Sequence, residues 1–566
     1  MPGVAAVKAG SRPPWLGLGA AVWVQVGGGA SSTFALYSRA LKVALGVDQR
    51  RLVLLAVACD IGENLGLLPG VLCNRLHPAL LLLVGAAACL LGYGTTWLVV
   101  SGAAHALPYW LIWFALCLAT NGGAWLVTAV LVTNMRNFPL SRGAVAGILK
   151  GYSGLSAAVY TEIYTGVLHD SPANLLLLLA LGIPAVCLVA MYFVRPCEPS
   201  LVENTAEQVH FMFAQMASVL LGIYLVGATI LDHVVTLNAA TNYTLLAIMV
   251  LLLFAPLGIP LKMTVFPSNR RKGPLNSSEC SPTTDNDHKE PLLPSSSGPN
   301  LGKLEEDDAT DIDILLAEGE GAIKQKRRRP KRGEDFRFRE AILKADFWLL
   351  FAMYFIGVGS GITVLNNLAQ VGLAAGAFDT TISLSLFSVC NFFGRLGGGA
   401  VSEYLVRSRT LPRTVLITCT QVVMIVTYLL FALGRQATLY FSVALLGICY
   451  GVQFSVIIST SSELFGLKHF GKIYNFIALA NPMSAFLFNS LAGYVYDLEA
   501  QKQHPTTSGT DITCHGPNCF RLTFCVLSGM AGLGTLLSIV LTVRIRPVYQ
   551  MLYAGGSYSQ PRSSAH

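Results

Sequence analysis

Long apolar runs alternate with short polar loops along most of the chain. A bilayer core about 30 Å thick is crossed by a helix of roughly 20 mostly apolar residues, whereas the strands of a membrane barrel are about half as long and alternate in polarity. The runs lie at residues 15–37, 51–73, 79–101, 107–133, 144–168, 173–194, 211–231, 243–266, 346–369, 380–402, 413–433, 438–460, 471–496 and 521–545. The pattern predicts an all-α polytopic membrane protein with six helices, a further pair and six more, which gives 12 to 14 transmembrane helices.

The composition agrees with this prediction. Of the 566 residues, 53% are hydrophobic and 12% are charged, against about 25% charged in an ordinary soluble chain. The net charge of +8 comes from basic residues clustered beside the apolar runs, as the positive-inside rule describes. We therefore expect the lipid bilayer, and no nucleic acid, as a partner of a monomeric protein in the plasma membrane or a vacuolar endomembrane.

Five parts follow from the spacing of the runs. They are a six-helix half at 1–198, an extra helix pair at 199–266, a linker at 267–345, a second six-helix half at 346–546 and a tail at 547–566. The linker is rich in proline, serine and charged residues, a composition that predicts disorder. Basic residues in the short loops place the N-terminus, the linker and the tail in the cytosol.

A polar loop near the C-terminus, TCHGPNCF, contains Cys514 and Cys519. Their spacing allows a small disulfide bond, which would require an oxidising compartment. Counting the spans from a cytosolic N-terminus places this loop on the outer side, so the two indications agree.

No enzymatic constellation is present. The chain has no Walker loop, HExxH motif, nucleophile elbow or CxxC pair with a metal-site partner. The sequence predicts no catalytic residue, no metal site, no cofactor and no enzymatic activity.

Several motifs resemble those of one family. Residues 130–164, VLVTNMRNFPLSRGAVAGILKGYSGLSAAVYTEIY, resemble the signature of the plant nodulin-like family. The stretches GEDFRFREAILKADFWLLF, GSGITVLNNLAQ, LFGLKHFGKIYN and LAGYVYD resemble the same family, including its nuclear fusion defective 4-like members. The resemblance runs from Trp15 to Val543 and implies a major facilitator fold of two six-helix halves. The family often has Asp-Asn where this chain has Asn366-Asn367, and Lys-Asp where it has Cys59-Asp60.

A second motif lies at residues 391–403, NFFGRLGGGAVSE. It resembles the gating-loop motif of the monocarboxylate and oxalate/formate branch of major facilitators. The resemblance implies that an acid at the helix end pairs with basic residues of the next loop. The gating residues so implied are Arg395, Glu403, Arg407, Arg409 and Arg413.

Polar residues deep in the predicted spans are candidates for transport. A charge at the centre of a helix costs about 2.5–3.5 kcal/mol on insertion, so Asp60 and Glu63 need a reason to be there. Two nearby carboxylates raise each other's proton affinity, which suggests proton exchange; the alternative is a pair satisfied by a neighbouring helix. Lys150 is predicted to face inward and to pair with a carboxylate, either of a substrate or of the protein, for which Asp60 and Glu63 are the first candidates; the alternative is that it extends to the lipid headgroups. The remaining candidates for substrate or proton contact are Asn64, Glu162, Asn366, Gln370, Tyr450, Gln453 and Asn481.

These observations predict a secondary-active transporter of a small organic solute, a carboxylate by the resemblance and Lys150, that works by alternating access with proton coupling. The alternative is a membrane sensor or scaffold that acts through its cytosolic linker.

Overall fold

The structure is a computed structural model that describes residues 12–47, 49–104, 107–197, 205–234, 239–265, 332–376, 380–503 and 514–553. Nearly all of the predicted linker and most of the C-terminal tail lie outside these residues. In the described part of the chain all regular structure is helical.

The first half begins with a broken crossing and ends before residue 198. Its helices are α1 (Arg12–Gly28), η1 (Ala30–Thr33), α2 (Phe34–Leu45), α3 (Gln49–Asn64), α4 (Leu67–Leu72), α5 (Pro78–Val100), α6 (Tyr109–Asn137), α7 (Arg142–Gly166) and α8 (Pro172–Phe193). The extra pair follows as α9 (Thr205–Val234), α10 (Ala239–Phe254), η2 (Ala255–Leu257) and α11 (Gly258–Val265).

The second half starts with a short helix outside the predicted spans. Its helices are α13 (Phe338–Ile342), α14 (Ala345–Asn366), α15 (Leu368–Ala375), α16 (Thr380–Arg409), α17 (Thr414–Leu433), α18 (Gln436–Phe465), α19 (Phe470–Ala478), α20 (Ala480–Gln503) and α21 (Asn518–Leu552). The boundary between α19 and α20 falls just before Pro482, because proline is favoured in the first turn of a helix and disfavoured within one.

Fourteen crossings result when the broken helices α1–α2, α3–α4, α10–α11, α14–α15 and α19–α20 are each counted once. The six, two and six crossings of the sequence pattern are therefore present in the described residues. Eleven of the helices described are apolar and long enough to span a membrane. The three other crossings are α1–α2, α7 and α16, and the last two carry charged residues in their interiors.

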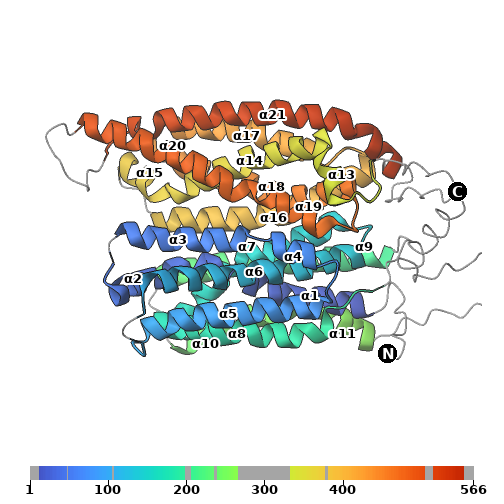
Figure 1. Ribbon diagram of the computed structural model, residues 1–566, viewed down its shortest axis with the longest axis horizontal. Coiled ribbons are helices and arrows are strands. Elements are labelled where there is room, and N and C mark those ends of the chain that lie inside the picture. The colour runs from blue at the N-terminus through green and yellow to red at the C-terminus, as the bar shows by residue number, and fades with distance from the viewer. Residues whose placement is uncertain are drawn as a thin grey trace, which may run out of the picture. The chain divides into compact units, whose positions relative to one another are not determined.

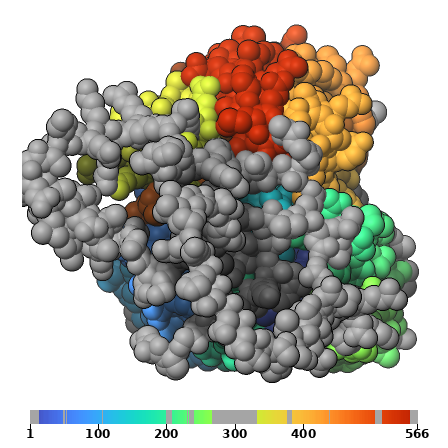
Figure 2. Space-filling view, turned by 90° about the vertical axis from the view of Figure 1, so that its right-hand side faces the viewer, coloured from blue at the N-terminus to red at the C-terminus, as the bar shows by residue number. Residues whose placement is uncertain are grey.

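The two halves lie side by side, as Figure 1 shows with the first half in blue to green and the second in yellow to red. Figure 2 looks along the crossings and shows the same separation. The ends at which α13 and α11 lie are called the linker side here, and the opposite ends, with α2 and α15, the disulfide side. Crossings α7 and α16, which carry charged residues in their interiors, pack directly against each other. Charged spans thus face the interface between the halves instead of lipid, as insertion energetics require.

The outer surfaces of both halves are apolar. Exposed leucine, valine, phenylalanine and isoleucine side chains recur along the spans, as at Leu91, Leu188, Leu251, Phe486 and Val543. Such a surface is stable only in lipid, where every backbone polar group must be satisfied within the helices. The protein is an integral, multi-pass membrane protein.

The extra pair lies against both halves. Helix α9 packs on α7 and also on α16, while α11 packs on α1. A Cβ atom added at Gly222 of α9 would lie within 3 Å of the Phe392 ring of α16. The pair therefore packs beside the α7–α16 contact.

Two predicted boundaries change. The linker was expected to be disordered to residue 345, yet residues 332–345 are described, with Phe336 buried against Phe465. The tail was expected to begin at 547, yet α21 continues to Leu552 and buries Tyr549 and Tyr553. Both segments hold aromatic side chains that pack on the ends of the helices, which composition averaged over a long segment does not reveal.

Candidate functional site

Two broken helices, one from each half, meet where the halves face each other. Helix α3 ends at Asn64 and α4 begins at Leu67; opposite them α19 ends at Ala478 and α20 begins at Ala480. The Asn481 amide donates a hydrogen bond to Asn64 Oδ1 at 3.3 Å, which joins the two breaks. Interrupted helices free backbone groups at membrane depth, and transporters use such breaks to build binding sites.

The acids singled out by the sequence lie in the last turns of α3. Asp60 and Glu63 are both exposed although they stand at the middle of the α3–α4 crossing. Ser31 of η1 donates a hydrogen bond to Glu63 Oε2 at 2.8 Å, and Asn64 donates to the Asp60 carbonyl at 2.9 Å. Neither carboxylate forms an ion pair with a described residue. The expected pairing with Lys150 is therefore wrong.

Lys150 of α7 instead lies beside aromatic and basic groups. Its Nζ atom lies 5.7 Å from the centre of the Tyr474 ring of the opposite half. Its carbonyl oxygen accepts a 3.0 Å hydrogen bond from Nη1 of Arg395 in α16. The sequence correctly predicted that Lys150 is buried and faces inward, since its side of α7 carries the glycines that permit close packing.

Arg395 lies deeper in the membrane than the sequence suggested. It is the sixteenth of the 30 residues of α16, because this helix continues to Arg409 and not only to residue 402. Its guanidinium lies 4.6 Å from the centre of the Phe454 ring, and its Nε donates to Asn391 Oδ1 at 3.0 Å. Glu63 of the other half acts on it electrostatically. We call Lys150 and Arg395 together the central group. Arg395 thus lies apart from the other predicted gating residues.

The other predicted residues fall into three groups. Asn366 and Gln370 are exposed near the break between α14 and α15. Gln453 is buried inside the second half, where its amide donates to Met424 Sδ at 3.1 Å, and Tyr450 packs on Phe387 and Phe454.

Glu162 is half-buried in the disulfide-side part of α7 and acts electrostatically on Tyr224 of α9. It faces the extra pair, away from the central residues.

Helices α7 and α16 approach almost backbone to backbone. A Cβ atom added at Gly399 would lie 2.7 Å from the Cα atom of Gly147, and one added at Gly147 would lie 3.2 Å from the Arg395 carbonyl oxygen. A Cβ atom at Gly399 would have no room, and one at Gly147 would require its neighbours to shift by a few tenths of an ångström, so this close contact favours glycine at both positions. This close contact places Lys150 of α7 and Arg395 of α16 at the same height along the two helices.

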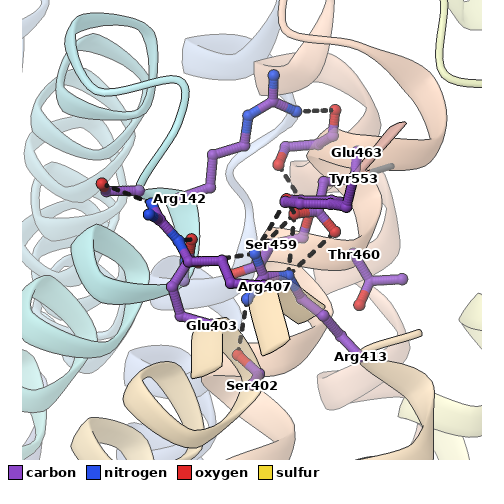
Figure 3. A network of polar contacts seen from close by, with 12 residues as sticks. Arg142, Ser402, Glu403, Arg407, Arg413, Ser459, Thr460, Glu463 and Tyr553 are labelled. Carbon is purple, nitrogen blue, oxygen red and sulfur yellow. Dashed lines mark hydrogen bonds and ion pairs between the residues drawn. The ribbon is translucent and has the colours of Figure 1, made fainter. Parts of the chain in front are cut away.

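The predicted gating residues form a buried network at the linker-side end of α16 (Figure 3). Arg407 Nε donates to Glu403 Oε1 at 2.8 Å, and Arg413 Nη2 donates to Glu403 Oε2 at 2.7 Å. The Arg413 side chain is fully buried. Arg409 is exposed and takes no part in the network, because its position on the helix points away from Glu403.

A second acid, Glu463, completes this network and was missed from the sequence. Arg413 donates to it from Nε and from Nη2, at 2.7 to 3.0 Å. The hydroxyls of Tyr549 and Tyr553 each donate to it at 2.6 Å. An acid at the end of an apolar run, in STSSELF, was a signal for this residue. Its partners at the end of α21 had been assigned to the tail.

Part of the network belongs to the other half. The backbone N–H of Gly143 donates to Glu403 Oε2 at 3.0 Å, and Arg407 Nη2 donates to the Leu140 carbonyl at 2.7 Å. In the reverse direction, Arg142 Nη1 donates to the Ser462 carbonyl at 2.9 Å. These bonds join the halves on the linker side.

A further contact closes the same side beside α4. Arg136 Nη2 donates to Asn74 Oδ1 at 2.5 Å and to the Lys468 carbonyl at 3.0 Å. The Asn74 amide lies 3.2 Å from Nδ1 of His469. Burial, with the nearby ammonium groups of Lys472 and Lys468, lowers the pKa of His469 below its usual value. This shift disfavours the positively charged form of the ring.

Cys514 and Cys519 form a disulfide bond between the end of α20 and the start of α21. The described residues contain no group of three or more histidine, cysteine, aspartate or glutamate side chains that could hold a metal ion.

The crossings, the two halves and the contacts between them are those of the major facilitator fold. Family comparison agrees: the model described as Nodulin-like matches residues 14–261, and the model described as NFD4, C-terminal domain, matches residues 334–551. The chain thus joins a region similar to the Nodulin-like model to a region similar to the NFD4 C-terminal domain. The first match includes α9 and α10, so the nodulin-like domain does not end at residue 198 as expected.

Individual relatives support this assignment. The Arabidopsis thaliana protein NUCLEAR FUSION DEFECTIVE 4 is 28% identical over 548 residues, which cover 95% of this chain and 90% of that protein. The uncharacterized MFS-type transporter YhjX of Escherichia coli K12 is 28% identical over 151 residues, which cover 26% of this chain and 36% of that protein.

Solved structures share the fold at low sequence identity. The human organic anion transporter MFSD10 (TETRAN) gives a TM-score of 0.52 at 10% identity, over 93% of this chain and 99% of that one. The proton:xylose symporter XylE gives a TM-score of 0.51 at 11% identity, over 94% of this chain and 95% of that one.

Proposed function

We propose that this protein is a secondary-active transporter that moves a small organic carboxylate by alternating access, coupled to protons. The observation that carries this proposal is the contact between Lys150 and Arg395, one from each half, with no ion pair to an acid among the described residues; Glu63 acts on Arg395 only at longer range. Lys150 is buried and Arg395 is half-buried, and charged groups at this depth are costly. An anionic substrate between the halves would offset that cost.

A carboxylate fits the chemistry of these groups. Guanidinium and ammonium groups bind carboxylates through charge-assisted hydrogen bonds, which are shorter and stronger than neutral ones. The amides of Asn64 and Asn481, at the two helix breaks, provide neutral donors and acceptors for a second polar group of the solute. The relationship to an MFS-type transporter supports the general class.

Alternating access requires that the halves separate on one side while they stay joined on the other. The network around Glu403 and the contact around Arg136 join them on the linker side. Asp60 and Glu63 are exposed at mid-membrane. We assign this arrangement to the state that is closed toward the cytosol, with the linker side cytosolic.

Proton coupling would use the acids of α3. Asp60 and Glu63 lie three residues apart on one helix face and have no basic ion-pair partner among the described residues. Nearby carboxylates share protons more readily than isolated ones. A proton bound there would reduce the negative charge that an incoming carboxylate meets.

The test is uptake into sealed proteoliposomes that contain the purified full-length protein. Radiolabelled mono- and dicarboxylates would be offered with the external pH below, equal to or above the internal pH. We expect uptake of one or more carboxylates without ATP, and faster uptake when the outside is more acidic. A transporter that carries only neutral or cationic solutes would contradict the carboxylate assignment.

A matched variant separates transport from scaffolding. Deletion of residues 270–325 removes linker that lies outside the described residues and leaves Arg332 and its contacts in place. Transport is expected to persist in this variant. Uptake by neither protein, across all three pH conditions, would contradict the transporter proposal and favour the sensor or scaffold.

A further inference from the structure

The end of the linker is attached to the gate by a short segment, residues 332–337, which we call the strap. Arg332 Nε donates to Asp346 Oδ2 at 2.7 Å, and Arg332 Nη1 donates to the Arg544 carbonyl at 2.9 Å. The Phe336 side chain is 1% exposed and lies under the amine of Lys344. The strap is therefore held to the second half by charge at its start and by burial near its end.

The strap also pairs with the backbone that follows Glu463. The Gly333 N–H donates to the Leu464 carbonyl at 3.3 Å, and the Phe336 N–H donates to the Phe465 carbonyl at 3.0 Å. These acceptors are the two residues after the acid that holds Arg413 in the network. The strap thus satisfies carbonyl groups left open at the end of α18.

One residue of the strap reaches the loop that contacts the other half. Asp335 Oδ1 accepts a 3.0 Å hydrogen bond from the Lys468 N–H, while the Lys468 carbonyl accepts one from Arg136 of the first half. The same peptide segment is held by the strap on one side and by the first half on the other. Gly466 allows this approach, since it has a φ of +77° and a Cβ there would meet Asp335.

We propose that Asp335 is a positioning residue for the cytosolic gate: it holds the loop 466–469 in the conformation in which Lys468 and His469 contact the first half. The proposal rests on the alternating access proposed above. Without the Asp335 bond the Lys468 peptide loses the anchor at its N–H group. The closed state then loses stability relative to the state in which the linker side is open.

A native thiol can report this change without any substrate. Cys73, at the end of α4, is 7% exposed, and its Sγ atom lies against Gly471 of α19 in the other half. Separation of the halves on the linker side would expose it. The rate at which a charged maleimide labels the Cys73 peptide, measured by mass spectrometry on the purified full-length protein, is therefore a measure of gate opening.

The decisive comparison is between Asp335→Ala and Asp335→Asn. We expect Asp335→Ala to raise the labelling rate of Cys73 about two- to tenfold, the population shift that the loss of one ordinary hydrogen bond permits. Asp335→Asn should label like the wild type, because its amide oxygen can still accept the Lys468 N–H bond. Arg136→Gln, which removes the anchor on the other side, should raise the rate in the same direction.

Unchanged labelling in Asp335→Ala would overturn the proposal, and so would equal increases in the alanine and asparagine variants. The elution volume and tryptophan fluorescence of each variant would establish that it is folded. Because labelling needs no solute, a failure to transport carboxylates would leave this result intact. A failure of the positioning role would in turn leave the carboxylate assignment intact.

Discussion

The network around Glu403 and the central group around Lys150 both lie between the halves, but their charges are paired differently. In the network Arg413 is fully buried and bound by two carboxylates, and each oxygen of Glu463 also accepts a hydrogen bond from a tyrosine hydroxyl. In the central group Lys150 and Arg395 contact aromatic rings and a carbonyl, and no acid among the described residues pairs with them.

The difference separates two uses of charge in a membrane. Satisfied charges fix a geometry, because removing one partner leaves an uncompensated ion in a poorly hydrated site. Charges without an ion-pair partner in the protein remain able to bind a solute of opposite charge. The network is therefore expected to control stability and closure, and the central group to control which solute is carried.

The largest effect is expected from Glu463→Gln. Arg413 would retain Glu403 alone, and we expect a loss of about 3 kcal/mol in the free energy of unfolding, the lower end for a broken buried ion pair. Tryptophan fluorescence during denaturant unfolding in detergent would measure it. Glu499→Gln is the matched control, because Glu499 pairs with an exposed lysine and should lose less than about 1 kcal/mol. Equal losses in the two variants would contradict the comparison.

The central cations should affect uptake and not stability. Lys150→Gln and Arg395→Gln are each expected to lower carboxylate uptake at subsaturating solute by about 10- to 100-fold, the value of one charge-assisted hydrogen bond. Proteoliposome uptake and denaturant unfolding would be measured on the same preparations. A loss of unfolding free energy as large as that of Glu463→Gln, with uptake per folded molecule unchanged, would contradict this prediction. It would show that Lys150 and Arg395 stabilise the fold and do not bind the solute.

A smaller effect is expected from the acids of α3. The wild type should take up carboxylate faster as the external pH falls, because protons bind the acids before the solute does. If one of the two acids carries the proton, its variant among Asp60→Asn and Glu63→Gln should lower the ratio of the uptake rates at pH 5.5 and pH 7.5 by about threefold or more. Unchanged pH profiles in both variants would contradict proton coupling through Asp60 and Glu63. The two acids would then serve only in contacts between helices.

The smallest effect is expected from Arg409→Gln. The sequence groups Arg409 with Arg407 and Arg413, but it is exposed and outside the network. We expect a change in unfolding free energy within about 0.5 kcal/mol, as for an ordinary surface substitution, and unchanged uptake. A loss comparable to that of Glu463→Gln would show that the network extends further than the structure shows.

Much of the fold could be predicted because it depends on local patterns. The length and apolar character of each run predict the crossings, since lipid requires every backbone group to be satisfied within its own helix. The glycines of residues 147–154 predict the close packing of α7, although not its partner. Glu403 and two of its arginines could be predicted from their motif.

The candidate site was predictable only in part, for reasons that involve distance along the chain. Glu463 receives its partners from Arg413 and from Tyr549 and Tyr553, between 50 and 90 residues away. Arg395 was placed too near the membrane surface because hydropathy ends the span at 402, whereas the helix ends at Arg409. In the sequence Gln453 is a polar residue within an apolar span, which suggests contact with a solute. Only the packing of the helices shows that it faces Met424.

The sequence by itself determined that this is a helical membrane protein of two halves, since apolar length and local charge decide insertion before any helices pack. The tertiary structure decided which charges are satisfied and which are left open. Pairing depends on the close approach of α7 to α16 and of the strap to the loop 466–469, and these contacts bring together residues that no local pattern relates.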